Sequence, residues 1–248
     1  MNWFETVMNA RPFDGVYIFD CHGHLDRDIH IWQGDVHAEA IVRSLDRLGV
    51  DAICLSSILA FTSDWRLGNG NVAAAAKAYP GKIYGYAVPT PFDPECDLRP
   101  YLEETPGFLG VKIHGFMQGN TPLDDPRYFP AYDLAAEKNI PVLFHAWTPQ
   151  EIRSAKALAE RYPSVPMILG HSGFVDPAAR EIAIDACRKQ DNLFCDTCIS
   201  YTYDGALEDL VSRIGADRVL YGSDINFYDN AFGLGRLALS RLSEGISA

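Results

Sequence analysis

The sequence predicts a closed (β/α)8 barrel formed by a single domain, residues 1–248. Three observations lead to this prediction. Short apolar, β-branched runs alternate with stretches of helical period along the whole chain, and no linker separates them. Eight such β-then-α units fit within 248 residues, a length typical of this barrel. A doubly wound open sheet usually carries Gly-x-Gly-x-x-Gly after its first strand, and this sequence does not.

Strands are expected where apolar residues run almost continuously, because the strands of such a barrel are buried on both faces. In chain order, the expected strands are 16–20, 52–56, 83–88, 110–114, 142–145, 167–171, 193–197 and 219–223.

Helices are expected in the stretches between these strands. Several begin with suitable turn chemistry: Thr148 and Asp176 each precede a proline at the first helical position. The expected helices are 36–48, 71–79, 94–104, 128–138, 149–162, 177–189, 206–214 and a final stretch after residue 229.

The composition is that of a globular chain, with 48% hydrophobic and 22% charged residues. Lysine and arginine total 21 against 33 acidic residues, and the net charge of −12 disfavours nucleic acid as a partner. No apolar run is long enough to span a bilayer, so we expect no membrane partner. The first residues lack the basic start and apolar core of a secretory signal, which predicts a cytoplasmic protein.

The six cysteines lie mostly inside apolar runs, which is typical of buried packing residues in a reducing compartment. Cys195 and Cys198 form a Cys-x-x-Cys pattern without a second pair. Residues three apart on a strand point to opposite faces, so we interpret these two cysteines as packing residues as well.

Polar residues gather at the ends of the expected strands. His22 and His24 follow the first strand, His114, His145 and His171 end the fourth, fifth and sixth, and Asp224 follows the eighth. The C-terminal ends of barrel strands converge on one face, where the active sites of such barrels lie. We therefore expect the functional site at this face.

The pattern His22-Gly-His24 indicates that two imidazoles share one side of the chain. Residues i and i+2 of a strand project to the same side, so both histidines can point over the barrel mouth while Cys21 and Gly23 face away. His145 and Asp224 then complete a set of three imidazoles and one carboxylate, which suits zinc or a similar divalent ion such as manganese.

Five segments give the chain a resemblance to a known family: "FDCHGHLD", "GVKIH", "VLFHAW", "ILGHSG" and "LYGSDINF". Together they span most of the chain. On these motifs the sequence resembles the amidohydrolase superfamily, within it the amidohydrolase-related branch that includes aminocarboxymuconate-semialdehyde decarboxylase. The resemblance implies a (β/α)8 barrel and a metal held by His22, His24, His145 and Asp224. It further implies that His171 is an acid/base or substrate-polarising residue.

Lys112 occupies the position where members with two metals carry a carboxylated lysine, and His114 shares its strand face. If Lys112 is carboxylated and bridges two metals, the site holds two ions. The alternative is that Lys112 pairs with a neighbouring acid and His114 lines the pocket. We favour this alternative, and with it one ion.

The function predicted from these residues is metal-dependent hydrolysis of an amide, lactone or ester bond in a small, carboxylated molecule. A divalent ion with an open position lowers the pKa of bound water to about 7, and Asp224 is placed to take its proton. His171 would polarise the carbonyl. The same ligands also serve decarboxylation of a small aromatic or unsaturated carboxylic acid. A third hypothesis is a barrel that binds a ligand without turning it over.

A small-molecule partner is expected in a pocket lined by aromatic and flexible apolar side chains. The candidates are Trp147, Met117, Tyr201 and Phe227, which suit a planar or apolar body. Exposed barrel helices often support dimers in such enzymes, so a homodimer is expected by analogy.

Overall fold

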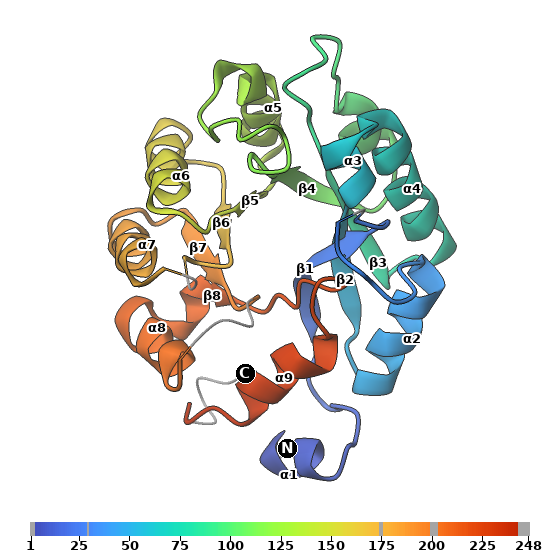
Figure 1. Cartoon of the computed structure of the whole chain (residues 1–248), viewed down its shortest axis with the longest axis vertical. Helices are drawn as coiled ribbons and strands as arrows, with labels where there is room; N and C mark the ends of the chain where they lie inside the picture. Colours follow the sequence, from blue (N-terminus) through green and yellow to red (C-terminus); the bar gives the residue numbers. More distant parts are fainter. Residues whose placement is uncertain (1–2, 29, 174–175, 199–202, 243–248) are drawn as a thin grey trace.

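The computed structural model describes residues 3–28, 30–173, 176–198 and 203–242. Within these ranges, eight parallel strands form one sheet in the order β1 to β8, and helices surround it (Figure 1). This confirms the (β/α)8 barrel. The strands are β1 Phe19–Leu25, β2 Ala52–Ser57, β3 Ile83–Ala87, β4 Phe108–Ile113, β5 Val142–His145, β6 Met167–Gly170, β7 Leu193–Asp196 and β8 Val219–Leu220.

Backbone hydrogen bonds between the first strand and the segment that follows the last strand close the barrel. Cys21 N donates to Tyr221 O at 2.9 Å, and Asp224 N donates to His22 O at 2.7 Å. A further bridge joins Gly23 and Ile225. The chain segment that carries Asp224 is therefore fixed directly against the two histidines of β1.

Most helices lie where the sequence predicts them. They are α1 Trp3–Met8, α2 Ala38–Leu48, α3 Ile58–Thr62, α4 Trp65–Ala78, η1 Pro100–Glu104, η2 Pro126–Tyr128, α5 Phe129–Lys138, α6 Pro149–Arg161, α7 Pro177–Lys189, α8 Ala206–Ile214, η3 Ala216–Arg218 and α9 Asn230–Ala238. The predictions missed α1 and α3. They also began the second main helix at residue 71, whereas α4 starts at Trp65 because Asp64 caps it by accepting from Arg66 N and Leu67 N.

The helix predicted at 94–104 is wrong over most of its length. Within this range only Pro100–Glu104 is a helical element, a short π-helix. Pro91, Pro94 and Pro100 crowd this stretch, and proline both lacks a backbone N–H and disfavours the α conformation of the residue before it. The third unit of the barrel is thus covered by a loop and a short π-helix instead of a full α-helix.

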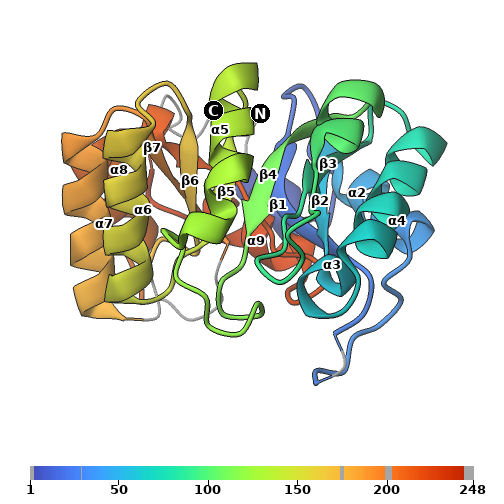
Figure 2. The same cartoon turned by 90° about the horizontal axis from the view of Figure 1, so that it is seen from above.

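The inside of the barrel is apolar, except at the C-terminal ends of the strands, where it is polar. Cys54, Tyr86, Leu143 and Ile168 form a buried cluster inside the sheet. Burying one such aliphatic side chain contributes roughly 1.5–3 kcal/mol to folding. Polar residues occupy the C-terminal strand ends, and the segments after β1 and β4 extend on that same side (Figure 2).

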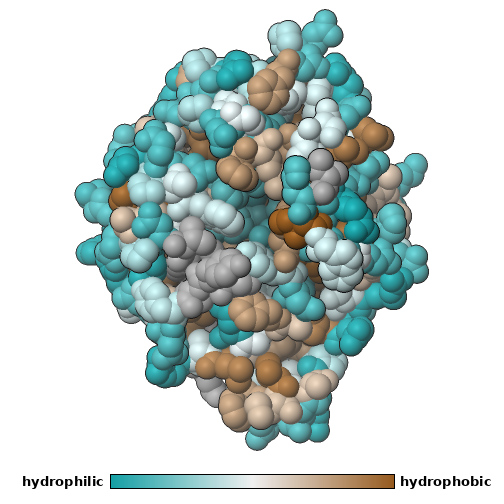
Figure 3. Space-filling view, in the orientation of Figure 1, coloured by the Kyte–Doolittle hydropathy of each residue, from teal (hydrophilic) through white to brown (hydrophobic). Residues whose placement is uncertain are grey.

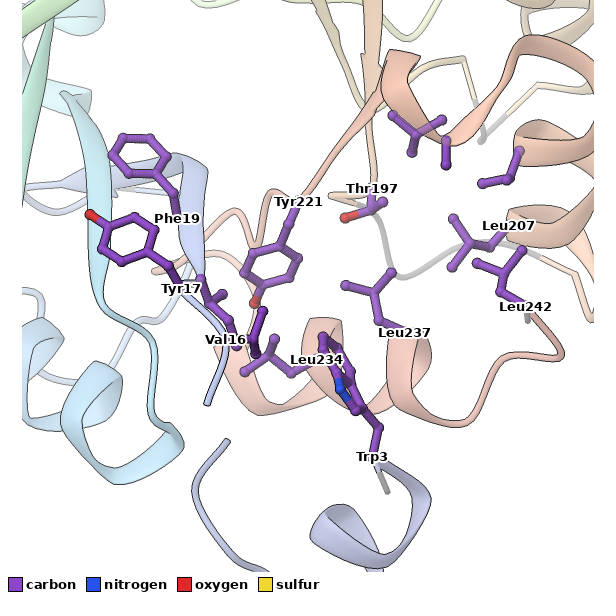
Figure 4. A pocket seen from close by; sticks show the side chains of 14 residues that line it. Trp3, Val16, Tyr17, Phe19, Thr197, Leu207, Tyr221, Leu234, Leu237 and Leu242 are labelled. Atoms are coloured by element: carbon purple, nitrogen blue, oxygen red, sulfur yellow. The ribbon is translucent and has the colours of Figure 1, made fainter. Parts of the chain in front are cut away.

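A cavity of about 220 Å³ lies on the outer wall, at the start of β1 and β8. Figure 4 shows Trp3, Tyr221 and Leu237 among the side chains around it. The histidines and Asp224 of the expected site are not part of its described lining. In the described ranges, no helix is long and apolar enough to cross a membrane.

Candidate functional site

A β-bulge in the first strand aims the two histidines of the His-x-His motif. Asp20 pairs with Ile53 and Gly23 pairs with Leu55, so both Cys21 and His22 lie opposite the single residue between them on β2. The motif lies within β1, whereas we expected it to follow a strand at 16–20. The expected regular alternation, with Cys21 and Gly23 both facing away, is interrupted by the bulge at Cys21 and His22. Bulges often re-aim a side chain beside an active site, and this one does so for His22.

Asp224 meets these two histidines from the other end of the chain. Its Oδ1 lies 3.1 Å from Nε2 of His24 and 3.7 Å from Nε2 of His22. All three side chains are buried. Oδ1 nevertheless receives no well-directed hydrogen bond among the described residues. A buried carboxylate oxygen that faces ring nitrogens without a proper donor is suited to binding a cation.

The three proposed histidine ligands each have Nδ1 engaged, so that Nε2 is the nitrogen available to the centre, where Nε2 of His22 also contacts Lys112 Nζ at 2.7 Å. The Nδ1 partners are Asp196 Oδ2 for His22 at 2.7 Å, Ser56 Oγ for His24 at 3.0 Å and Glu151 Oε1 for His145 at 3.0 Å. Metal-binding histidines usually hold their second nitrogen in this way. The donor set therefore fits a divalent ion bound through Nε2 atoms and a carboxylate.

Burial keeps the histidines in the form that can bind a metal. Burial lowers the pKa of His24 and, together with the neighbouring Lys112, lowers the pKa of His22 far below its ordinary value. Burial opposes the ionisation of Asp224, but the contact with His24 and the nearby His171 outweigh it and lower its pKa. Neutral imidazoles and an ionised carboxylate are what a cation requires.

His145 lies near this centre but not within it. His22, His24 and Asp224 offer donor atoms that all lie within 4.8 Å of one another, and His145 is not in this described group. Its ring stacks on His114 at 4.1 Å and meets His171 edge-on at 4.9 Å. The structure thus brings three of the four expected ligands together and places the fourth beside them.

Lys112 is fully buried, and its Nζ lies 2.7 Å from Nε2 of His22. Burial lowers the pKa of this amine. We expected Lys112 to pair with a neighbouring acid. This contact corrects that expectation, because the close partner of the Lys112 amine is the imidazole of His22. His114 lies on the same strand face and is buried, and burial lowers its pKa as well.

His171 stands at the end of β6 in a left-handed turn, with φ of 67°. Its Nδ1–H donates to Cys198 O at 2.9 Å. Burial lowers its pKa to about 3, so the ring is neutral near pH 7. Nε2 of a neutral ring with Nδ1–H is an acceptor. His171 is therefore placed as a neutral ring with an acceptor nitrogen, which fits the acid/base role among the two roles that the resemblance implies.

Several residues of the site were not predicted from the sequence. Asp196 ends β7 and contacts both His22 and His171. Cys198, expected to be a packing residue, lies with its Sγ 2.9 Å from Nδ1 of His22. A signal for Asp196 was present, because an acid closes the apolar run 193–195. Glu151 belongs to the Thr148-x-x-Glu151 capping box, which is also readable from the sequence.

Flat side chains surround the centre. Trp147 lies 4.8 Å from His145 and 5.3 Å from His171, measured between ring centroids, and its Nε1 is buried without a described partner. Phe227 lies 5.3 Å from His24. Phe61, which was not predicted, lies between His24 and His114. Met117 packs on the cluster around Phe61. Tyr201 lies outside the described residues.

The face that carries these residues is hollowed near its centre (Figure 3). A family model, Amidohydro_2, described as amidohydrolase, matches residues 19–244. The chain belongs to this amidohydrolase family. The match extends from the first strand, with its His-x-His motif, past α9. Among curated proteins, no sequence matches the chain.

Solved structures similar to this amidohydrolase share its fold. A dihydroxybenzoic acid decarboxylase from Polaromonas sp. JS666, with manganese and 2-nitroresorcinol bound, is 19% identical, with 93% of each chain covered and a TM-score of 0.72. A 5-carboxyvanillate decarboxylase from Novosphingobium aromaticivorans, also with manganese, is 14% identical, with 96% of this chain and 95% of that chain covered and a TM-score of 0.74. A 4-oxalomesaconate hydratase from Rhodopseudomonas palustris is 17% identical, with 93% of this chain and 91% of that chain covered and a TM-score of 0.69.

Proposed function

We propose that the protein is a divalent-metal-dependent enzyme that decarboxylates a small, planar carboxylic acid. The observation that carries the proposal is the placement of flat rings around the metal-ligand set: Phe61, Phe227 and Trp147 each pack against one of its histidines. A ring-lined pocket suits an aromatic or conjugated body. The named decarboxylases of similar fold, which act on aromatic acids, support the same choice.

His22, His24 and Asp224 would hold the ion, with His145 as a fourth ligand. An imidazole-rich set suits zinc, and the manganese in the two decarboxylases makes manganese the other candidate. A divalent ion supplies Lewis acidity toward an oxygen of the bound substrate. We propose one ion, because the Lys112 amine contacts His22 and because the two described groups of donor atoms, His22 with His24 and Asp224 and His22 with His171 and Cys198, share His22.

The chain's own side chains then bind the substrate and move one proton. The bond between the carboxylate and its carbon breaks, carbon dioxide leaves, and the electron pair stays on the carbon. That carbon must gain a proton. Asp224 is the ionised group beside His24, so it can take up a proton from solvent and pass it to the carbon, which returns Asp224 to its ionised form. Trp147 Nε1–H is a buried donor for a substrate oxygen.

Hydrolysis of an amide, lactone or ester is the second candidate. It is favoured by the ionised Asp224, whose Oδ1 lacks a proper donor and can accept the proton of an attacking water. His171, neutral and with Nε2 free to accept, is available for a second proton transfer. Both reactions use the same metal ligands, so the ligands do not separate them.

Product analysis separates the two candidates. The purified protein, loaded with zinc or manganese, is incubated with a panel of hydroxybenzoic acids and of lactones and amides of similar size. Release of carbon dioxide together with the decarboxylated ring supports the proposal. Ring opening or amide cleavage without carbon dioxide replaces it with hydrolysis. Turnover of neither class, by a protein that binds the ion, contradicts both.

Two further proposals concern the whole protein. We propose a homodimer, by analogy with barrel enzymes, and light scattering of the purified protein measures its mass. We also propose a cytoplasmic location, which cell fractionation tests.

A further inference from the structure

The carboxylate of Asp196 contacts two histidines of the site at once. Oδ2 accepts Nδ1–H of His22 at 2.7 Å, and Oδ1 accepts the backbone N–H of His171 at 2.8 Å. The thiol of Cys198 donates to the same carboxylate, at 3.0 and 3.1 Å from its two oxygens. Asp196 is fully buried. One side chain thus connects a proposed metal ligand with the proposed proton acceptor.

The contacts of His22 specify which ring nitrogen carries the proton. Lys112 Nζ lies 2.7 Å from Nε2, and its N–H groups can donate to the electron pair of Nε2. Nδ1 must then carry the proton, and Asp196 accepts it. An ion bound at Nε2 needs that same free electron pair. The hydrogen-bond pattern around His22 therefore already has the tautomer that metal binding requires.

The second contact of Asp196 fixes the turn that holds His171. His171 and Ser172 both have a left-handed backbone conformation, with φ of 67° and 52°, which residues other than glycine rarely adopt. The bond from His171 N to Asp196 Oδ1 and the bond from Ser172 Oγ to Asp196 O, at 2.8 Å, hold this turn to the end of β7. The rings of His22 and His171 consequently lie 5.1 Å apart.

We propose that Asp196 is a positioning residue that presents Nε2 of His22 to the ion and holds His171 beside it. This inference rests on the proposed metal centre. An asparagine in its place would offer an amide N–H to Nδ1 of His22 and thereby favour the proton on Nε2, where it blocks an ion. Replacing the aspartate of a serine-protease triad by asparagine stabilises the wrong tautomer in the same way.

Two measurements on the full chain test the proposal. Nitrogen-15 NMR of the metal-free protein reports which nitrogen of His22 carries the proton: Nδ1 is expected in the parent and Nε2 in Asp196→Asn. Titration with manganese(II) or zinc(II) against a competing chelator is expected to show about 10- to 100-fold weaker binding for Asp196→Asn, and partial recovery for Asp196→Glu.

The matched control is Asp20→Asn. Asp20 is as buried as Asp196, and burial raises the pKa of both carboxyls to about 7. Asp20 accepts from the backbone N–H groups of His22 and Ser223, from the Ser223 side chain and from Asn230, and it contacts no imidazole ring in the described residues. This variant is expected to keep the Nδ1–H tautomer and to lose much less affinity. Equal losses in the two variants would show that any buried carboxylate has the same effect, and would overturn the proposal.

Each remaining outcome also supports or overturns the role proposed for Asp196. A parent protein with the proton on Nε2 of His22 overturns the proposal, as does an Asp196→Asn variant with unchanged tautomer and affinity. If that variant does not fold, the tautomer of the parent decides alone. If the parent binds neither ion, the proposed function fails, while the tautomer measurement still supports or overturns the role of Asp196.

Discussion

Glu151 joins the start of a helix to the candidate site, and its removal should cost both stability and metal binding. Its Oε2 accepts from Trp147 N at 3.0 Å, from Thr148 N at 2.9 Å and from Thr148 Oγ1 at 2.9 Å, while Oε1 bonds Nδ1 of His145. Thr148 Oγ1 in turn caps α6 by accepting from Glu151 N. Glu151→Ala removes this acceptor from four donors at once.

The expected loss follows from these contacts. Breaking a helix cap costs about 1 kcal/mol, and a hydrogen bond to a charged acceptor contributes roughly 1.5–3 kcal/mol. Water replaces the acceptor at exposed Thr148, whereas the donors of Trp147 and His145 are less accessible. We therefore expect Glu151→Ala to lower the free energy of unfolding by about 2–4 kcal/mol. Glu151→Gln keeps an acceptor oxygen and should lose less.

Urea unfolding of the metal-free protein, followed by circular dichroism, measures this free energy. Glu160→Ala is the control on the same helix: Glu160 is half exposed and pairs with Lys156, so its loss should stay below about 0.5 kcal/mol. A Glu151→Ala variant within about 0.5 kcal/mol of the parent would refute the reasoning. Metal titration of the same variants should show weaker binding for Glu151→Ala, because Nδ1 of His145 loses its partner.

The contribution of Glu151 also depends on pH. Burial by itself would raise the pKa of Glu151, but the hydrogen bonds from His145 and Thr148 outweigh it and lower the pKa below the ordinary 4.5. A lowered folded-state pKa means that the stabilisation is complete above pH 4.5 and is lost as the pH falls through the folded-state value. The difference in stability between the parent and Glu151→Gln should therefore shrink in acid.

Three other predictions concern the metal and its surroundings. Dialysis against a chelator should abolish the proposed activity, and zinc or manganese should restore it; an active metal-free protein would contradict the metal role. Metal analysis should give one equivalent per chain, whereas two equivalents together with the added mass of carbon dioxide on Lys112 would establish the two-ion alternative. Gly170→Ala should destabilise the barrel and weaken metal binding, because a Cβ at this position would lie 2.3 Å from Phe144 O and 2.9 Å from His22 Cε1. The control is Gly235→Ala, where a Cβ would have nothing within 4 Å, so its urea unfolding and metal titration should stay close to those of the parent.

The strands were predictable because burial on both faces leaves apolar runs in the sequence, and β5 matches its predicted range of 142–145. The first strand was placed too early because its second half, residues 21–25, contains histidines and a glycine, which do not form an apolar run. The third helix was predicted from its period although prolines interrupt it. In both places, local chemistry overrode the pattern.

The candidate ligands were predictable because each lies at a strand end, where barrel topology brings distant segments together. Their partners were not. Asp196 lies far from His22 along the chain, and the contact depends on neighbouring side chains in three dimensions. The same holds for Ser56 beside His24. The bulge at Cys21 and His22 depends on register, which no periodic pattern in one strand specifies.

Backbone hydrogen bonds join the first strand to the segment after the last one. The candidate metal site therefore depends on the closed barrel. His22 accepts from Asp224 N through its carbonyl oxygen, and the same two residues provide ring nitrogen and carboxylate to the centre. A chain that stops before residue 219 would lack β8 and Asp224, and with them the carboxylate that faces both imidazoles. Coordination should therefore report directly on whether the two ends of the polypeptide have come together.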